Sequence, residues 1–165
     1  MINQSGQRPS HHSNANARFY FESSVTSEWI SPITTGYSAW DQTNGHQFDF
    51  IRELSDTSSN ANVSVTSAQI CGKATAVGCT SAGADSNNHI IEGTATIKFR
   101  STISTSLRDD VAAHEFGHYA GLGHSDVSSA TMYPTVAAGQ SSLHTVDRRG
   151  RCQIHGHAHG WWGGC

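Results

Sequence analysis

The sequence predicts an α+β fold, in which one mixed, twisted β-sheet is accompanied by three helices. Short segments with apolar residues at alternate positions predict strands, and longer segments with helix-start signals predict helices. A chain of 165 residues can bury one core but is short for two domains. Residues 1–16 show no apolar periodicity, so we expect them to form a flexible arm and residues 17–165 to form a single domain.

The amino-terminal half should supply three strands and one helix. Residues 18–21 form a short aromatic strand, and further strands are expected around residues 48–51 and 63–65. Ser31 followed by Pro32 is typical of a helix start, with Ser as the N-cap and Pro in the first turn. One face of that helix would carry three large apolar residues: Ile33, Tyr37 and Trp40.

The remaining elements follow from residue 72 onward. Residues 72–88 are small and polar, which predicts a long surface loop. Residues 94–99 alternate as a strand with one polar face. Residues 106–109 resemble a capping box that opens a second helix, and residues 143–155 are expected to form the last one. The apolar stripe of the second helix includes Leu107, Val111 and Ala112.

Composition excludes several classes of function. Charged residues make up 14% of the chain and the formal net charge of −3 includes no basic block, which argues against nucleic acid as a partner. No apolar run approaches the length of a membrane span. Residues 1–4 do not open a signal peptide, so an export signal was either removed or not used. A surface rich in Ser and Thr favours an extracellular protein, with a monomer as the default.

The four cysteines fall into two local pairs without the Cys-x-x-Cys spacing of a zinc knuckle. Two disulfides, Cys71–Cys79 and Cys152–Cys165, are the preferred interpretation, and free buried thiols are the alternative. Disulfides would place the protein in an oxidising compartment.

The densest chemical signal is the segment from His114 to His124, which reads H-E-x-x-H-x-x-G-x-x-H. Residues four apart lie on one face of a helix, so His114 and His118 would direct their rings at one ion. Gly121 permits the left-handed backbone that lets the chain leave the helix and bring His124 to the same ion. Three ligands and an open fourth position describe a catalytic zinc site.

Glu115 follows the first histidine directly, which would place its carboxylate beside the metal-bound water and not on the metal. It is therefore the candidate general base. The alternative is that these are ordinary histidines in a chain that contains 11 of them. A chance alignment of the five fixed positions has a probability on the order of one in ten thousand, so we reject coincidence.

The extended motif resembles the metzincin metalloproteases. Ser125 and the segment 130–134, Ala-Thr-Met-Tyr-Pro, resemble the matrixin branch, the matrix-metalloprotease type of catalytic domain. The resemblance implies a zincin-like fold with an active-site helix, a backing helix and a C-terminal helix. It also implies a zinc-dependent endopeptidase with one catalytic Zn²⁺ that acts on proteins or peptides. Met132 would form an apolar floor beneath the three histidines.

The same resemblance implies where substrate would bind. An extended peptide would pair antiparallel with the strand at residues 94–99, and so contact Ala95 and Thr96. The main specificity pocket would be formed by Met132, Tyr133, Pro134, Thr135 and Val136.

Other metal sites have weaker support. A weak calcium site could be formed by Asp85, Asn87, Asn88 and Glu92, although a solvated loop is the preferred interpretation. A second metal could also bind the histidines of the carboxyl-terminal tail, His155, His157 and His159, or those of the arm, His11 and His12.

Two rival functions are also compatible with the sequence. A zinc-stabilised but catalytically silent binding or assembly protein would keep the fold without turnover, but it would have no need of Glu115 beside an open metal site. A metal-sequestering protein would rely on the histidine-rich tail, residues 156–165.

Overall fold

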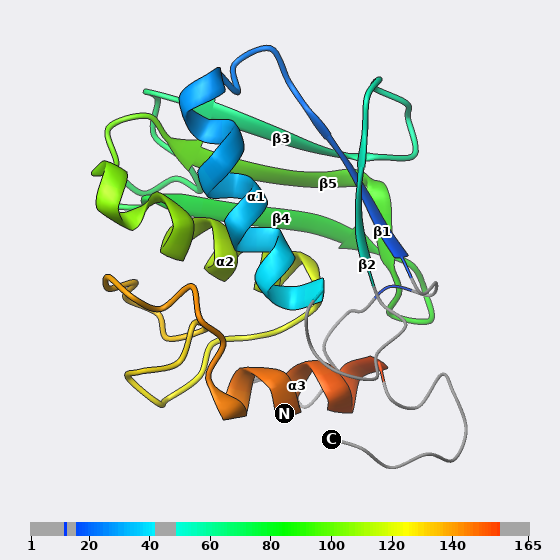
Figure 1. The fold of residues 1–165 in the computed structure, drawn as a ribbon. Helices are drawn as coiled ribbons and strands as arrows, with labels where there is room; N and C mark the ends of the chain where they lie inside the picture. Colours follow the sequence, from blue (N-terminus) through cyan, green and yellow to red (C-terminus); the bar gives the residue numbers. More distant parts are fainter. Residues whose placement is uncertain (1–11, 13–15, 42–48, 156–165) are drawn as a thin grey trace.

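The fold is a five-stranded mixed sheet with three α-helices, which confirms the predicted fold class. A computed structural model describes residue 12, residues 16–41 and residues 49–155 (Figure 1). The strands, in chain order, are β1 (Asn16–Phe21), β2 (Asp49–Glu53), β3 (Ala61–Thr66), β4 (Gly78–Ala84) and β5 (Ile90–Arg100). They lie in the order β2-β1-β3-β5-β4, all parallel to their neighbours except β4, which is antiparallel to β5.

Helices α1 (Ser27–Asp41) and α2 (Arg108–Tyr119) lie on the same face of the sheet, while α3 (Thr145–His155) lies at its lower margin in this view (Figure 1). The core between the sheet and the first two helices is rich in aromatic rings, several in edge contact. Its largest fully buried side chains include Trp29, Trp40, Phe19, Phe99 and Phe116. The first part of the histidine motif therefore lies on α2, the helix with the most buried residues in the described part of the molecule.

Helix α1 begins at Ser27, four residues before the predicted start at Ser31. Pro32 consequently lies inside the helix, where it lacks the N–H group that would bond the carbonyl oxygen of Glu28. That oxygen accepts a hydrogen bond from Nη1 of Arg108, at 3.4 Å, instead. A side chain from the following helix thus compensates for the proline, which a local helix-start signal could not reveal.

The interpretation of residues 72–88 as one long loop is wrong, because residues 78–84 form β4. Small and hydroxyl-bearing residues hide the strand alternation in this stretch of sequence. The strand forms because it pairs with β5 from Gly78↔Phe99 to Ala84↔Ile90 and packs against α2. Tertiary contacts override weak local propensity here.

Residues 94–99 are a strand, but β5 is not at the edge of the sheet. Thr96 is paired on one side with Asn62 of β3 and on the other with Ser81 of β4. Ala95 is 2% exposed. The backbone of β5 therefore cannot accept an added strand, which corrects the expected substrate-binding role of Ala95 and Thr96.

Helix α2 lacks the predicted capping box at residues 106–109. A 3₁₀ turn, Thr105–Leu107, leads directly into the helix, and no side-chain cap hydrogen bond is found at either start. Asp109 and Asp110 lie in the first turn, where negative charge interacts favourably with the helix dipole. Asp110 also accepts hydrogen bonds from the backbone N–H groups of Gly139 and Ser141.

His12 is buried, although we expected residues 1–16 to form a flexible arm. Its Nε2 lies 2.7 Å from the carbonyl oxygen of Tyr119, and its Nδ1 lies 3.0 Å from the Glu92 carboxylate. His11 and the other residues of 1–15 lie outside the described residues, so a metal-binding arm stays a prediction.

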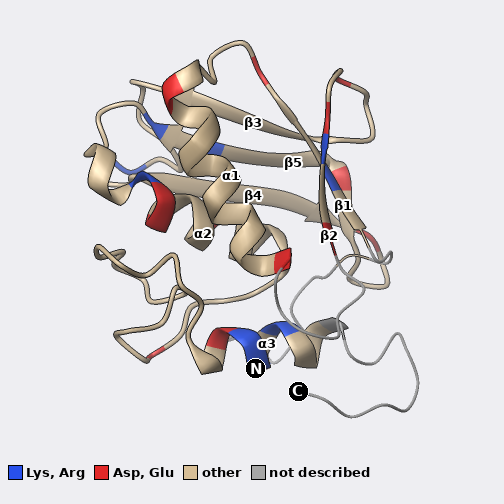
Figure 2. Cartoon of the chain, in the orientation of Figure 1, with Lys and Arg blue, Asp and Glu red and all other residues tan. Residues whose placement is uncertain are grey.

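Charged residues of both signs are spread over several elements, and α3 carries both (Figure 2). In the described ranges, no helix is long and apolar enough to span a lipid bilayer. The predicted Cys71–Cys79 disulfide is present and joins the segment before β4 to that strand. Cys152 is 2% exposed, and its predicted partner Cys165 lies outside the described residues.

Candidate metal centre

Helix α2 fixes the first two histidines through hydrogen bonds to backbone carbonyls. Nδ1 of His114 lies 2.7 Å from the oxygen of Thr131, and Nδ1 of His118 lies 2.8 Å from the oxygen of Leu122. A carbonyl oxygen only accepts, so both Nδ1 atoms carry the proton. The lone pair is therefore on Nε2 of each ring, which is the arrangement that metal-binding histidines adopt.

The third histidine arrives through the turn that ends α2. Gly121 has φ of 93°, a left-handed conformation that a side chain would make costly. Its N–H donates to the oxygen of His118, and the N–H of Leu122 donates to the oxygen of Gly117, which together form a Schellman motif. This turn places the carbonyl oxygen of Leu122 beside Nδ1 of His118. It also reverses the chain, so that His124 comes close to the other two histidines.

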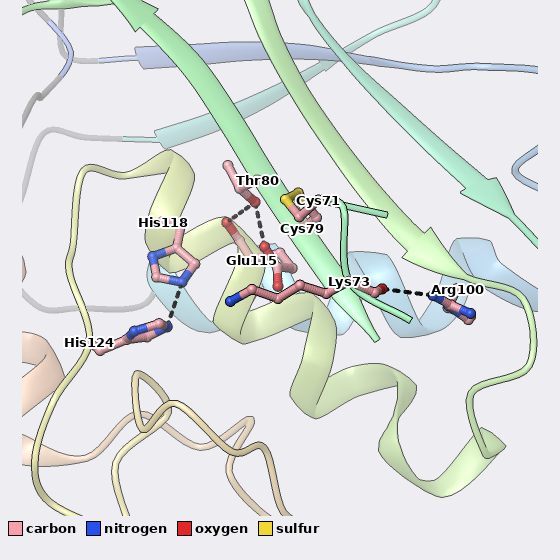
Figure 3. The surroundings of a disulfide bond; sticks show 8 residues. All are labelled: Cys71, Lys73, Cys79, Thr80, Arg100, Glu115, His118 and His124. Atoms are coloured by element: carbon pink, nitrogen blue, oxygen red, sulfur yellow. Dashed lines mark hydrogen bonds between the residues drawn. A yellow bond between two sulfur atoms is a disulfide. The ribbon is translucent and has the colours of Figure 1, made fainter. Parts of the chain in front are cut away.

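The three histidines meet as the sequence predicts. One ring nitrogen of each lies within 4.8 Å of the others, and Nε2 of His118 lies 3.2 Å from Nε2 of His124 (Figure 3). Two imidazole nitrogens bound tetrahedrally to zinc are separated by about 3.3 Å, given Zn–N bonds of about 2.0 Å. The donor type, the tautomers of His114 and His118, and the spacing of His118 and His124 fit Zn²⁺.

Met132 lies beneath the triad and is 1% exposed. Its carbonyl oxygen accepts a hydrogen bond from the N–H of Ser125, directly after the third histidine. Its sulfur packs against Gly117, on α2 between the first two histidines. Met132 thus packs on α2 and is hydrogen-bonded to the segment after His124, which is consistent with the predicted apolar floor.

Replacing Gly117 with Ala should destabilise the protein by about 1 to 3 kcal/mol, because the added methyl overpacks this floor. A Cβ at this position would contact Sδ of Met132 and lie 2.6 Å from Cζ2 of the buried Trp40. Gly123→Ala is the matched control, since a Cβ there meets nothing within 4 Å. Denaturant unfolding of both variants tests this, and equal stabilities would contradict the packing described.

Asp147, in the first turn of α3, holds the segment around Met132 in place and is 2% exposed. Its carboxylate accepts hydrogen bonds from the N–H groups of Thr131, Met132 and His144. Asp147 was not among the site residues predicted from the sequence. An acidic residue in the first turn of the last helix was its only signal.

Burial keeps the metal-facing imidazoles neutral. It lowers the pKa of His114, and it lowers the pKa of His118 to about 4, with a further contribution from the neighbouring His114 ring. The pKa of His124 is also lowered, first by partial burial and then by the positive charge of Lys73. Neutral imidazoles are the form that binds a metal ion, so little proton competition is expected near neutral pH.

Glu115 is almost fully enclosed, with 5% of its surface exposed. Burial raises the pKa of its carboxyl to about 7, and a hydrogen bond from Thr80 partly opposes this shift. Oγ1 of Thr80 lies 2.7 Å from Oε2 of the carboxylate (Figure 3). A carboxyl group with a pKa near 7 is well suited to exchange a proton at neutral pH.

A cleft of about 630 Å³ opens onto the three histidines and Glu115. Of the predicted pocket residues, Pro134, Thr135 and Val136 line it. Met132 is instead buried beneath the triad, and Tyr133 is not among the lining residues. The lining also includes residues of the disulfide loop and β4, namely Cys71, Lys73, Thr75, Ala76, Val77, Gly78, Cys79 and Thr80.

Two of the candidate calcium ligands, Asp85 and Glu92, have hydrogen-bond partners within the protein, and the calcium site stays a prediction. Oδ1 of Asp85 accepts hydrogen bonds from the N–H groups of Asn87 and His89, as expected of a residue that stabilises a tight turn. Glu92 contacts His12 and the N–H of Arg18. Within the described residues, the one cluster of three or more metal-binding side chains is the triad. His157 and His159 lie outside these residues.

Comparison with known proteins agrees with this site. The matrixin family model matches residues 11–156. Metalloendoproteinase 2-MMP of Arabidopsis thaliana is 49% identical over 35 residues, which cover 21% of this chain and 9% of that protein. Metalloendoproteinase 4-MMP of the same plant is 51% identical over 37 residues, 22% of this chain and 10% of that protein.

Matrix metalloproteinase-9 of Canis lupus familiaris is 49% identical over 47 residues, which cover 28% of this chain and 7% of that protein. The matched segments thus span a tenth or less of each relative's own length. The family model, by contrast, spans most of the chain, including both ends of the described sheet and all three helices. The chain belongs to the matrixin family.

Proposed function

We propose that this protein is a secreted, zinc-dependent endopeptidase in which His114, His118 and His124 hold one Zn²⁺ and Glu115 is the general base. The observation that carries the proposal is the convergence of the three imidazoles beside a carboxylate that faces the same cleft. The Cys71–Cys79 disulfide supports an oxidising, extracellular location.

When bound, zinc would acidify a water molecule and polarise the carbonyl of the scissile peptide bond. Glu115 accepts a proton from the attacking water and returns it to the departing amine. The carboxyl can do both because burial raises its pKa to about 7. A group with a pKa near the working pH can both accept and return a proton. Nδ1–H donation to Thr131 and Leu122 holds the two helical imidazoles in place throughout.

Substrate would bind along β4, the edge strand that lines the cleft, in place of the β5 location expected from sequence. β4 is paired with β5 on one side, which leaves its other backbone edge for an extended peptide. Pro134, Thr135 and Val136 line the same cleft as β4 and would bound a pocket for one substrate side chain.

The rival, a catalytically silent zinc protein, would fold and bind metal without cleaving peptides. Glu115 argues against it, because burial of a carboxyl group costs stability and buried groups with a shifted pKa cluster at functional sites. A metal-sequestering role for the tail rests on residues 156–165, which lie outside the described residues.

The test is a mixed peptide library incubated with the full chain, with and without a zinc chelator. We expect internal peptide bonds to be cut, cleavage to stop with the chelator, and activity to return when zinc is added back. A folded, zinc-loaded chain that cuts no member of the library would favour the silent binding protein. Cleavage that persists at full rate in the chelator would contradict a metal-dependent mechanism.

A further inference from the structure

Thr80 bridges two parts of the residue proposed as the general base. Its Oγ1 lies 2.7 Å from Oε2 of the Glu115 side chain and 3.0 Å from the carbonyl oxygen of the same residue. The hydroxyl comes from β4 and the glutamate from α2, so the contact joins the edge strand to the active-site helix (Figure 3).

Gly78 makes this contact possible. Residues two apart in a strand project from the same face, so Gly78 and Thr80 both face α2. A Cβ on Gly78 would contact Oε1 of Glu115 and lie 2.7 Å from its Cγ. The Glu115 carboxylate therefore packs against the backbone of Gly78, where no side chain would fit, and contacts the hydroxyl of Thr80.

A hydroxyl suits this position because it both donates and accepts. Its single proton can be donated to the ionised carboxylate or to the backbone carbonyl oxygen, but only to one of them at a time. The shorter contact, 2.7 Å, is with Oε2, so the hydroxyl fixes the position of the carboxyl group itself. The 3.0 Å contact with the carbonyl oxygen keeps the same hydroxyl beside the backbone of α2.

We infer that Thr80 is a positioning residue, which holds the Glu115 carboxyl between β4 and the metal-facing side of α2 so that it meets the attacking water. This inference rests on the proposed function. Thr80 lines the same cleft as the histidines, and among the described residues its hydroxyl contacts two oxygens of Glu115. Its effect on turnover is therefore exerted through that residue.

The test compares Thr80→Val, which keeps the shape of the side chain, with Thr80→Ser, which keeps the hydroxyl. We expect Thr80→Val to lower kcat by about 10- to 100-fold with KM within about twofold, since it removes one hydrogen bond to a charged group. Thr80→Ser should recover most of that loss. Thr35→Val is the control, because residue 35 is an exposed threonine on α1 that does not line the cleft.

A second measurement separates positioning from general damage to the fold. In the Glu115→Gln background, adding Thr80→Val should cause no comparable further fall in kcat, because the two residues act as one unit. Zinc content and thermal midpoint of each variant are measured in parallel. If Thr80→Val fails to fold, Thr80→Ala against Thr80→Ser provides the same comparison.

Two results would overturn the inference: a Thr80→Val enzyme with wild-type kcat, or a Thr80→Ser enzyme as impaired as Thr80→Val. Failure of the proposed function looks different, since the wild-type chain itself would then cut no peptide.

Discussion

Glu115→Gln should lower kcat for peptide cleavage by about 10²- to 10⁴-fold, the usual contribution of a general base. The amide has nearly the same shape and can still accept the hydrogen bond from Thr80. It cannot take a proton from water. Zinc content and the free energy of unfolding should therefore change little, and steady-state kinetics with metal analysis of the same sample measure both.

Glu53→Gln provides the matched control, since Glu53 lies on β2 at the far edge of the sheet and pairs with Arg18. It should keep wild-type kcat. Undiminished cleavage by the Glu115 variant would remove the base from the proposed mechanism. Loss of zinc from that variant would instead indicate that the carboxylate is a metal ligand.

His118→Ala should abolish metal binding and, with it, all cleavage. Two imidazoles remain, and His124 is an exposed side chain on a turn with no helix to hold it. Loss of an outer partner of a metal ligand commonly weakens binding by about 10- to 100-fold, so loss of the ligand itself should cost more than about 100-fold. Zinc content after dialysis, measured by atomic absorption, provides the test.

His89→Ala is the control for that experiment, because His89 pairs with Asp85 at the turn between β4 and β5, away from the triad. It should retain one zinc ion per chain. Stoichiometric zinc in the His118 variant would contradict the ligand set and point to a different donor.

The metal site was predictable from sequence because its geometry is local. Helical spacing aligns His114 with His118, the adjacent Glu115 follows from the same helix, and Gly121 sets the turn that returns His124. None of these relations depends on how the sheet is ordered, so a single stretch of 11 residues carried them.

The walls of the cleft were not predictable in the same way, because they depend on contacts between distant elements. Thr80 lies in a segment without apolar alternation, and only pairing with β5 and packing on α2 make it a strand. The sheet order also decides which strand is at the edge, and no local pattern around Ala95 reports that order. Pro32 was misplaced for the same reason, because its compensating partner is Arg108.

The most direct test of the metal centre is anomalous X-ray diffraction at the zinc edge, from crystals of the full chain loaded with zinc. A single strong peak should lie about 2.0 to 2.1 Å from Nε2 of each of the three histidines, with an open coordination position facing Glu115. An imidazole of His124 turned into solvent, or a fourth protein side chain on the ion, would contradict the account.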